Sequence, residues 1–276
     1  MSKVWLITGT SRGLGRQLAV SVLEHGDRVV ATARRPEQLK DLTETYGDRV
    51  RTVALDVTDP AAARAAVAEA VGAFGRLDVL VNNAGYADVA SIEDMPEESF
   101  RAQIEANFFG VVNVTRAALP VMRAQGGGHI IQVSSVGGRV ASIGLGAYQS
   151  AKWAVGGFSE VLAREVEPFG IKITVAEPGG MRTDWAGDSM STLPISDAYK
   201  PVIEPAVARF SEHNGHQPGD PTRIAQVLID VADHPEPPLH LLLGADAVAV
   251  AQAKAESLAA SDARWRAVSE SVSYAE

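Results

Sequence analysis

A tyrosine and a lysine stand four residues apart near the middle of the chain, as Tyr148 and Lys152, and Ser135 precedes the tyrosine by thirteen positions. Residues four apart on a helix lie on one face, so the lysine ammonium can stand beside the phenol. A neighbouring positive charge favours the phenolate and lowers the pKa of a tyrosine from its ordinary value of ~10. The pair therefore predicts a side chain that can transfer a proton near neutral pH.

The same spacing can arise by chance, because five tyrosines and six lysines occur among the 276 residues. Three further motifs argue against chance. They are a glycine-rich turn from Thr8 to Gly15, the tetrad Asn82-Asn83-Ala84-Gly85, and the pair Ser134-Ser135. Together the four motifs indicate reductase chemistry.

The elements that must position these residues alternate along the chain. Short apolar segments rich in Val, Ile and Leu predict buried parallel strands, and segments with helical periodicity lie between them. This alternation predicts an α/β fold with a doubly wound seven-stranded parallel sheet, Rossmann-like, with helices on both faces and ligands at the carboxyl ends of the strands. We expect one domain over residues 1–276. The predicted strands span 4–8, 28–33, 50–55, 79–81, 129–133, 171–176 and 238–243, and the predicted helices span 13–25, 61–74, 97–123 and 148–166.

Two segments interrupt the alternation. Residues 183–221 carry scattered Pro, Gly, Ser and Asp, and an insertion of that length is typical of a lid or a binding loop. Residues 245–271 are rich in alanine and predict a C-terminal helix. We expect the buried residues of this helix to be Val248, Ala251, Ala255, Leu258, Trp265 and Val268.

Glycines follow the first predicted strand and open the first predicted helix. At Gly9, Gly13 and Gly15 the backbone can approach a pyrophosphate, and the helix N-terminus offers free N–H groups to it. Their spacing, Gly-x-x-x-Gly-x-Gly, differs from the Gly-x-Gly-x-x-Gly fingerprint of dinucleotide-binding proteins. The same mode of pyrophosphate binding is therefore expected, but not the same subfamily. The alternative is that these glycines only turn the chain.

The end of the second predicted strand bears on the choice of cofactor. An NAD-binding protein would place an acid there to accept from the ribose 2′-hydroxyl, but the segment continues from Ala33 into Arg34 and Arg35. Guanidinium groups at Arg34 and Arg12 suit a 2′-phosphate, so NADP(H) is the expected cofactor. Alternatively, the two consecutive arginines only lie in solvent at the start of a helix and bind no cofactor.

Composition narrows the function classes. No apolar run reaches the roughly 20 residues that a membrane span needs. A formal charge of −9 argues against nucleic-acid binding, and zero cysteines exclude disulfides and thiolate catalysis. His213 and His216 lie in a polar turn without a third ligand, so no metal site is expected. Since the first strand follows Met1 so closely, we expect no secretory signal and a cytoplasmic protein.

Taken together, the Thr8-Gly9-x-x-x-Gly13-x-Gly15 turn, the Asn-Asn-Ala-Gly tetrad, Ser135 and the Tyr148–Lys152 pair resemble the short-chain dehydrogenase/reductase superfamily over about residues 3–183. The resemblance implies that Tyr148 exchanges the alcohol proton. It implies that Lys152 holds the nicotinamide ribose and lowers the pKa of Tyr148, and that Ser135 orients the substrate carbonyl. Asn107 resembles the asparagine that holds a water in the proton relay.

The resemblance also implies where the cofactor lies. The tetrad would shape the adenine side and steady the fourth strand, while Asp56, at the end of the third strand, is placed to accept from the adenine amino group. Pro178 and Gly179 match the segment over the nicotinamide, and Thr183 would bond its carboxamide. The expected cofactor-binding residues are Gly9, Ser11, Arg12, Gly13, Leu14, Gly15, Arg34, Asp56, Val57, Asn83, Ala84, Gly85, Tyr148, Lys152, Pro178, Gly179 and Thr183.

These expectations combine into an NADP(H)-dependent oxidoreductase that transfers a hydride between nicotinamide and a ketone or secondary alcohol without a metal. The expected pocket wall is mostly apolar and predicts an apolar substrate, although several of its residues can instead pack the lid on the core. That wall comprises Tyr86, Val136, Gly137, Ile143, Gly144, Leu145, Met181, Trp185, Met190 and Leu193.

Two other functions are compatible with parts of this pattern. A catalytically silent NADP-binding regulator or scaffold would keep the fold, but such proteins usually lose the tyrosine or the lysine. A sugar-nucleotide epimerase or dehydratase would need a larger C-terminal region than residues 245–276 provide. The resemblance further implies a homo-oligomer, a dimer or a tetramer with the dimer favoured, formed through the helices at 97–123 and 148–166. A further contact is expected near the seventh strand, where the Ala-rich helix could cover it.

Overall fold

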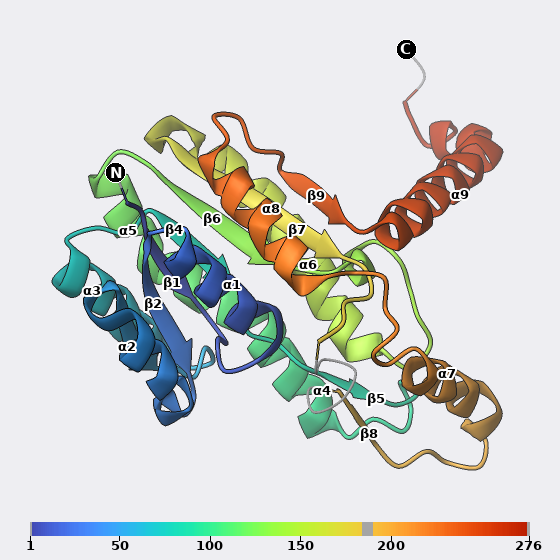
Figure 1. Cartoon of the computed structure of the whole chain (residues 1–276). Coiled ribbons are helices and arrows are strands. Elements are labelled where there is room, and N and C mark those ends of the chain that lie inside the picture. Colours follow the sequence, from blue (N-terminus) through green and yellow to red (C-terminus); the bar gives the residue numbers. More distant parts are fainter. Residues whose placement is uncertain (1, 184–189, 275–276) are drawn as a thin grey trace.

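The computed structural model describes residues 2–183 and 190–274. Its centre is a seven-stranded parallel sheet in the order β3-β2-β1-β4-β6-β7-β9 (Figure 1). The order runs in opposite directions on the two sides of β1, which confirms the predicted doubly wound fold. Each strand begins and ends within two residues of its prediction: β1 (Val4–Ile7), β2 (Arg28–Ala33), β3 (Val50–Ala54), β4 (Val79–Asn82), β6 (Gly128–Val133), β7 (Ile171–Pro178) and β9 (His240–Leu243).

Helices cover both faces of the sheet because side chains alternate along each strand. Trp5 and Ile7 of β1 belong to one core layer, and Val4 and Leu6 belong to the other. Burying one such side chain stabilises the fold by roughly 1.5–3 kcal/mol. The first layer lies under α1 (Gly13–Glu24), α2 (Lys40–Tyr46) and α8 (Pro221–Asp233), and the second under α3 (Pro60–Phe74), α5 (Gly110–Ala124) and α6 (Gly146–Val166).

The single helix predicted over residues 97–123 is divided in the structure. α4 (Glu97–Ile104) and α5 are joined by a π-helical turn, Glu105–Phe109. A π-helical turn widens one turn of a helix and often occurs at functional sites. Here it carries Asn107, whose side chain is fully buried.

The insertion at residues 183–221 contains regular structure in its described part. β8 (Met190–Thr192) pairs in parallel with β5 (Ala87–Val89), and α7 (Lys200–Glu212) follows. Met190 and Ile203 from this insertion pack in one cluster with Tyr148. The insertion therefore adjoins the side chain expected to be catalytic, while Trp185 lies outside the described residues.

The C-terminal helix, α9 (Ala245–Glu270), forms as predicted but is not buried as predicted. It leaves the body of the molecule and stands clear of it (Figure 1). Among its described residues only Ala247 and Ala251 are buried. Val248, Ala255, Leu258, Trp265 and Val268 are exposed, because no other described element of the chain lies opposite them.

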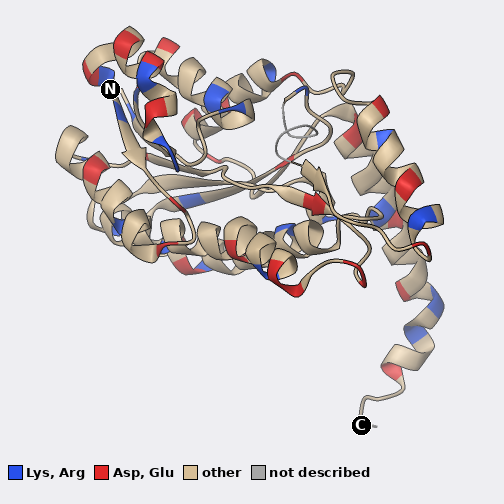
Figure 2. Cartoon of the chain, turned by 90° about the horizontal axis from the view of Figure 1, so that it is seen from below, with Lys and Arg blue, Asp and Glu red and all other residues tan. Residues whose placement is uncertain are grey.

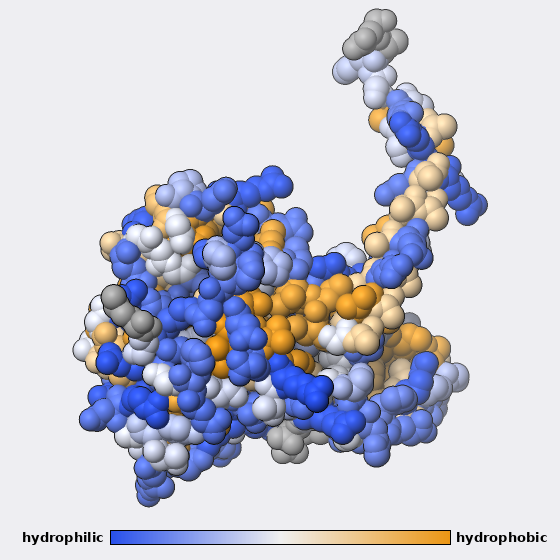
Figure 3. Space-filling model, turned by 45° about the horizontal axis from the view of Figure 1, so that its top comes forward, coloured by the Kyte–Doolittle hydropathy of each residue, from blue (hydrophilic) through white to orange (hydrophobic). Residues whose placement is uncertain are grey.

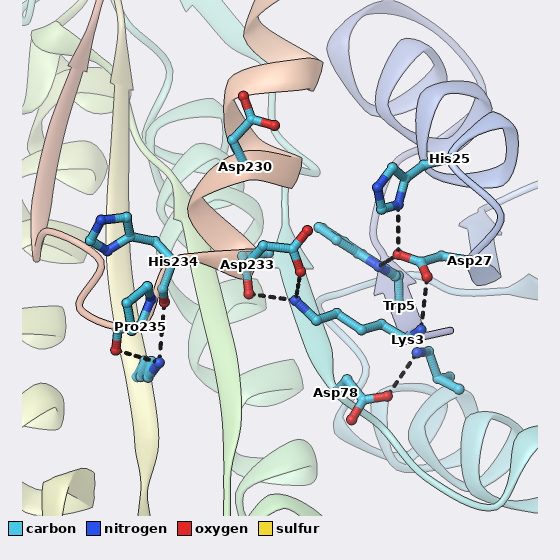
Figure 4. A network of polar contacts seen from close by, with 12 residues as sticks. Lys3, Trp5, His25, Asp27, Asp78, Asp230, Asp233, His234 and Pro235 are labelled. Atoms are coloured by element: carbon cyan, nitrogen blue, oxygen red, sulfur yellow. Dashed lines mark hydrogen bonds and ion pairs between the residues drawn. The ribbon is translucent and has the colours of Figure 1, made fainter. Parts of the chain in front are cut away.

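A polar network fastens the amino ends of the strands, at the edge opposite the expected site (Figure 4). The Lys3 backbone N–H donates to Asp27 Oδ1 at 2.8 Å, and the Trp5 indole donates to Asp27 Oδ2 at 3.0 Å. The Val4 N–H donates to Asp78 Oδ2 at 2.8 Å. The Lys3 ammonium donates to the Ala232 carbonyl at 2.7 Å. These contacts join β1, α8 and the starts of β2 and β4, and so hold together the edge of the sheet away from the cavity.

Candidate active site

A cavity of about 1210 Å³ opens at the carboxyl ends of the strands. Parallel strands all end at this edge, so motifs far apart in sequence meet there. Of the predicted site residues, only Gly15 and Asn107 are absent from the cavity wall. The wall includes Gly9, Ser11, Arg12, Gly13, Leu14, Arg34, Asp56, Val57, Asn83, Ala84, Gly85, Ser135, Tyr148, Lys152, Pro178, Gly179 and Thr183.

The chemically active side chains come from β6 and α6. Ser135 follows β6, and its hydroxyl accepts a hydrogen bond from the Gly137 N–H at 3.0 Å. The same side chain hydrogen-bonds the Tyr148 phenol. Lys152 lies one turn further along α6, with its Nζ 5.6 Å from the centroid of the Tyr148 ring. Serine, tyrosine and lysine thus stand together, as their spacing predicted.

The ionisation of this group differs from the expectation. Burial raises the pKa of Tyr148 to about 12, although the hydrogen bond from Ser135 acts in the opposite direction. Burial also lowers the pKa of Lys152 to about 8. The Lys152 ammonium donates to the Val133 carbonyl at 2.8 Å, so its hydrogen bond goes to the end of β6. The expected lowering of the tyrosine pKa by lysine is therefore wrong for this structure, and the phenol is protonated at neutral pH.

Asn107 holds a neighbouring loop from behind the cavity. Its Nδ2 donates to the carbonyls of Tyr86 and Gln103, both at 2.9 Å, and its Oδ1 accepts from the Tyr86 N–H at 3.1 Å. A Cβ at Gly85 would overlap this oxygen. The contacts fix the chain after β4, and the expected role in holding a water stays a prediction.

The tetrad after β4 supports the glycine turn directly. The Thr8 hydroxyl accepts from the N–H groups of Asn83 and Ala84, at 2.9 and 3.0 Å. The Asn83 amide donates to the carbonyls of Thr8 and Gly9 at 2.9 and 3.1 Å. A Cβ at Gly15 would overlap both the Asn83 amide and the Gly9 carbonyl. Gly15 therefore serves the turn by close packing, without facing the cavity itself.

The turn and the residues beyond it fit a dinucleotide. Gly9 and Gly13 have φ angles of +69° and +59°, a region that suits glycine. α1 begins without a side-chain cap from Arg12 and without an acid in its first turn, so its N-terminus favours an anion. Arg34 lines the same end of the cavity as Asp56. Hydrogen bonds from Thr58, and then the charge of Arg34, lower the pKa of Asp56.

The predicted substrate wall is correct only in part. Tyr86, Val136, Gly137, Leu145 and Met181 line the cavity. Ile143 instead faces solvent with 48% of its surface exposed, and Met190 and Leu193 pack in small clusters beside the site. Gly144 accommodates Val89 and does not line the cavity either. The wall also contains polar residues that the sequence analysis did not place there: Asp88, Ser142, Gln149, Ser191, His213 and Gln217.

Asp246 is a further residue that the sequence patterns did not reveal. It lies in the first turn of α9, lines the cavity, and accepts a hydrogen bond from the Gly180 N–H at 2.8 Å. A Cβ at Gly179 would overlap its carboxylate. The consecutive glycines after Pro178 were the available signal, because glycine is required where another group approaches the backbone closely.

A buried ion pair joins the loop after β6 to the end of β7 beside the cavity. Glu177, which is 2% exposed, pairs with Arg139 through two contacts of 2.9 and 2.5 Å. His240 Nδ1 lies 3.0 Å from the same carboxylate. Arg139 follows Ser135 in the chain and Glu177 precedes Pro178, so the pair links the serine loop to the end of β7.

Neither a metal-binding group nor a membrane-spanning helix occurs among the described residues. Within residues 2–183 and 190–274, no group of three or more His, Cys, Asp or Glu side chains could hold a metal ion. His213 lines the cavity, with its Nδ1 2.7 Å from the Arg209 carbonyl. No helix in the same part of the chain is long and apolar enough to cross a membrane.

Comparison with known proteins agrees with this geometry. A model of the short chain dehydrogenase family matches residues 3–193. The oxidoreductase BOA17 of Botryotinia fuckeliana is 53% identical over 270 residues, 98% of each chain. A short-chain dehydrogenase crystal structure from Streptomyces avermitilis has a TM-score of 0.93 at 38% identity, and covers 99% of this chain and 100% of its own. A short chain dehydrogenase from Burkholderia cenocepacia in complex with NADP has a TM-score of 0.73 at 26% identity, with 95% and 97% covered.

Proposed function

Because this chain is an oxidoreductase that belongs to the short-chain dehydrogenase family, we propose that it reduces a ketone to a secondary alcohol with NADPH, or catalyses the reverse reaction. One observation carries the proposal. The Tyr148 phenol lies in the cavity, is hydrogen-bonded to Ser135, and has Lys152 one helical turn away. This arrangement offers a proton donor and a polar group for one carbonyl oxygen.

Each side chain has a definite task in this reaction. When bound, NADPH supplies a hydride to the carbonyl carbon. Tyr148 donates its proton to the carbonyl oxygen, and Ser135 holds that oxygen by a hydrogen bond. The raised pKa of Tyr148 keeps its proton in place until charge develops on the substrate. Lys152, with its pKa lowered to about 8, can return a proton to the tyrosine near neutral pH.

The preference for NADP(H) rests on the end of β2. Arg34 lines the cavity there together with Arg12, and no acid follows the strand. A guanidinium binds a phosphate through two hydrogen bonds, which a 2′-hydroxyl cannot match. The NADP complex of the Burkholderia cenocepacia relative supports this preference.

The substrate we propose is a ketone or secondary alcohol with an apolar body. Val136, Val140, Leu145, Met181 and Phe210 line the substrate side of the cavity and exclude water from one part of it. The polar wall residues, such as Asp88 and Ser191, then contact a polar group at another part of the substrate. Apolar walls with a few polar groups are the usual composition of such pockets.

We also propose that the protein forms a homodimer through α5 and α6. Trp153 and Val161 of α6 are 47% and 58% exposed, and Phe109, the last residue of the π-helical turn before α5, is 43% exposed. Large apolar side chains on two neighbouring long helices are typical of a surface that a second subunit covers. Trp153→Glu is expected to remove this contact, as sedimentation velocity would show.

The test of the catalytic proposal is a comparison of NADPH and NADH oxidation with a panel of apolar ketones, with Tyr148→Phe as the control. Turnover that prefers NADPH and disappears in the variant supports both the reaction and the cofactor. If NADPH binds but no ketone is reduced by the wild-type protein, the silent-regulator interpretation replaces the catalytic one.

A further inference from the structure

Asp88 occupies the middle of β5 and is the residue of that strand that faces the cavity. Its neighbours Ala87 and Val89 are fully buried in a cluster that also contains Tyr148. Because side chains alternate along a strand, Asp88 points away from this cluster, and it is half-buried in the cavity wall. The strand therefore carries a carboxylate beside the cluster that holds Tyr148.

One bridge between β5 and the start of α6 fixes where Asp88 lies relative to Tyr148. Ala90, just after β5, pairs in parallel with Leu145, and its N–H donates to the Gly144 carbonyl at 3.1 Å. Asp88 precedes this bridge by two residues, about 7 Å along a strand. Tyr148 follows it by three residues, about 4.5 Å along a helix. Since both side chains line the cavity, one small molecule can contact the carboxylate and the phenol together.

Ser191 of β8 lies beside Asp88 on the same side of the two-stranded sheet. The two residues are register partners in the parallel pair of β5 and β8, and both line the cavity. Met190, the neighbour of Ser191, packs on the other side, in the cluster with Tyr148. A carboxylate can only accept hydrogen bonds, and a serine hydroxyl can accept as well as donate. The two side chains thus offer adjacent acceptors to a donor on the substrate.

The Asp88 carboxylate lacks a compensating charge within residues 2–183 and 190–274. No N–H, hydroxyl or cationic side chain of these residues binds it, and burial raises its pKa. Burial, and then the charge of Asp88, also raises the pKa of Tyr86, which lines the same cavity. A partly buried charge without a partner costs free energy, and a cation bound beside it would offset this cost.

The other charged residues of this protein mostly meet water. Lys, Arg, Asp and Glu lie mainly on the helices of the two outer layers, with few on the strands between them (Figure 2). Hydrophilic residues also cover much of the body in the view of Figure 3. Three other described acids line the cavity, but Asp56 and Asp246 each accept a hydrogen bond, and Glu105 is exposed. Asp88 is therefore the described wall carboxylate best placed to receive a cation.

We propose that Asp88 binds an ammonium group of the substrate, so that the ketone is an amino ketone and the product an amino alcohol. This inference rests on the proposed reductase function and names its substrate class. The ammonium donates to the Asp88 carboxylate and the Ser191 hydroxyl, while the apolar wall contacts the rest of the substrate. The hydride and the proton go to the carbonyl as in the proposed reaction, and the C–N bond is unchanged. Asp88 thereby selects the substrate and holds its carbonyl toward Tyr148.

Matched pairs of ketones measure this preference directly. The probes are phenyl ketones in which one, two or three methylenes separate the carbonyl from a dimethylammonium group. Each is paired with the neutral ketone that carries an isopropyl group of the same shape instead. A tertiary amine is used because it cannot condense with a ketone to an imine. With NADPH and the full-length protein, kcat/KM should be about tenfold higher for the ammonium ketone than for its counterpart at one or more chain lengths.

Variants of two cavity carboxylates assign the preference to a residue. Asp88→Asn removes the charge and keeps the size, so it should lower the ratio of the two kcat/KM values about tenfold. Glu105→Gln, which removes an exposed carboxylate from the same wall, is the matched control and should keep the wild-type ratio. Asp88→Lys should reverse the preference in favour of β-benzoylpropionate, a ketone with a carboxylate. A wild-type ratio in Asp88→Asn, or no ammonium preference at any of the three chain lengths, would overturn the proposal.

Binding measurements separate this result from the proposed reaction. Isothermal titration of the same ketones into the complex with NADP⁺ gives dissociation constants without turnover. If the neutral ketones are reduced and the ammonium ketones gain neither rate nor affinity, the reductase function stands and the role of Asp88 fails. If no ketone is reduced but the ammonium ketones bind about tenfold more tightly than their counterparts, and Asp88→Asn removes the difference, the ammonium site stands and the proposed reaction fails.

Discussion

The Asp246 carboxylate accepts a hydrogen bond from the Gly180 backbone N–H at 2.8 Å, which ties the start of α9 to the loop after β7. Both partners line the cavity. The second carboxylate oxygen of Asp246 is buried and has no hydrogen-bond partner among the described residues. Burying a polar oxygen without a hydrogen-bond partner costs free energy, so the contact between Asp246 and the loop is an important constraint on this part of the cavity.

Replacing Asp246 with alanine is expected to weaken NADPH binding about tenfold. The reason is that a hydrogen bond to a charged group stabilises a structure by roughly 1.5–3 kcal/mol, and here it holds the loop after β7 in place. Asp246→Asn keeps one acceptor oxygen and should retain most of the affinity. Titration of NADPH fluorescence measures both dissociation constants. Asp262→Ala, further along α9, is the control and should bind NADPH like the wild type. Unchanged affinity in the Asp246→Ala variant would remove the proposed constraint.

Tyr148→Phe removes the only hydroxyl that α6 places beside Ser135. We expect kcat for ketone reduction to fall by about 10²–10⁴, the usual contribution of a positioned acid. NADPH affinity should change little, because the cavity wall keeps its shape. Stopped-flow measurement of NADPH oxidation separates this loss of chemistry from a loss of binding. A variant with wild-type kcat would require another proton donor.

The motifs were sufficient to predict the site because the fold brings them to one place. Thr8 lies more than a hundred residues before Ser135 and Tyr148, yet each of the three lies at or beyond the carboxyl end of a parallel strand or in the helix that follows one. Sequence periodicity identifies such strands, and parallel pairing then fixes which ends meet. The parallel topology therefore explains why the sequence motifs could predict the residues that line the cavity.

The predictions failed where the outcome depends on the direction in which a side chain points or on how far it is buried from water. The spacing of Tyr148 and Lys152 shows that they share a helix face, but not that burial raises the tyrosine pKa or that Lys152 bonds the Val133 carbonyl. Likewise, the pattern in α9 identifies apolar residues without showing that no element in residues 2–183 or 190–274 covers them. Asp246 was missed because it looks like an ordinary acid in the first turn of a helix.

Arg34→Ala is expected to lower the affinity for NADPH by about tenfold or more and to leave the affinity for NADH nearly unchanged. The physical reason is that a guanidinium pairs with the 2′-phosphate, which NADH lacks. Isothermal titration with both cofactors gives the ratio directly. Arg35→Ala is the matched control, since Arg35 does not line the cavity. Equal losses for the two cofactors would place Arg34 away from the 2′-phosphate.

Lys152 makes stability depend on pH in a defined direction. Burial lowers its pKa from 10.5 to about 8, so between these values the folded protein binds fewer protons than the unfolded chain, and stability rises with pH. The full difference corresponds to about 3 kcal/mol. Tyr148 acts in the opposite direction only above pH 10, because its pKa rises from 10.0 to about 12.

Urea unfolding at pH 7.5 and 9.5 isolates the contribution of Lys152 below the range of the tyrosine. The test variant is Lys152→Met, which lacks the charge. The free energy of unfolding of the wild-type protein minus that of Lys152→Met should be about 1–2 kcal/mol larger at pH 9.5 than at pH 7.5. Lys40→Met, at an exposed lysine, controls for the loss of a surface charge. The same pH dependence in Lys152→Met and wild type would mean that Lys152 is hydrated in solution, and the dry environment that keeps the Tyr148 proton in place would then be absent as well.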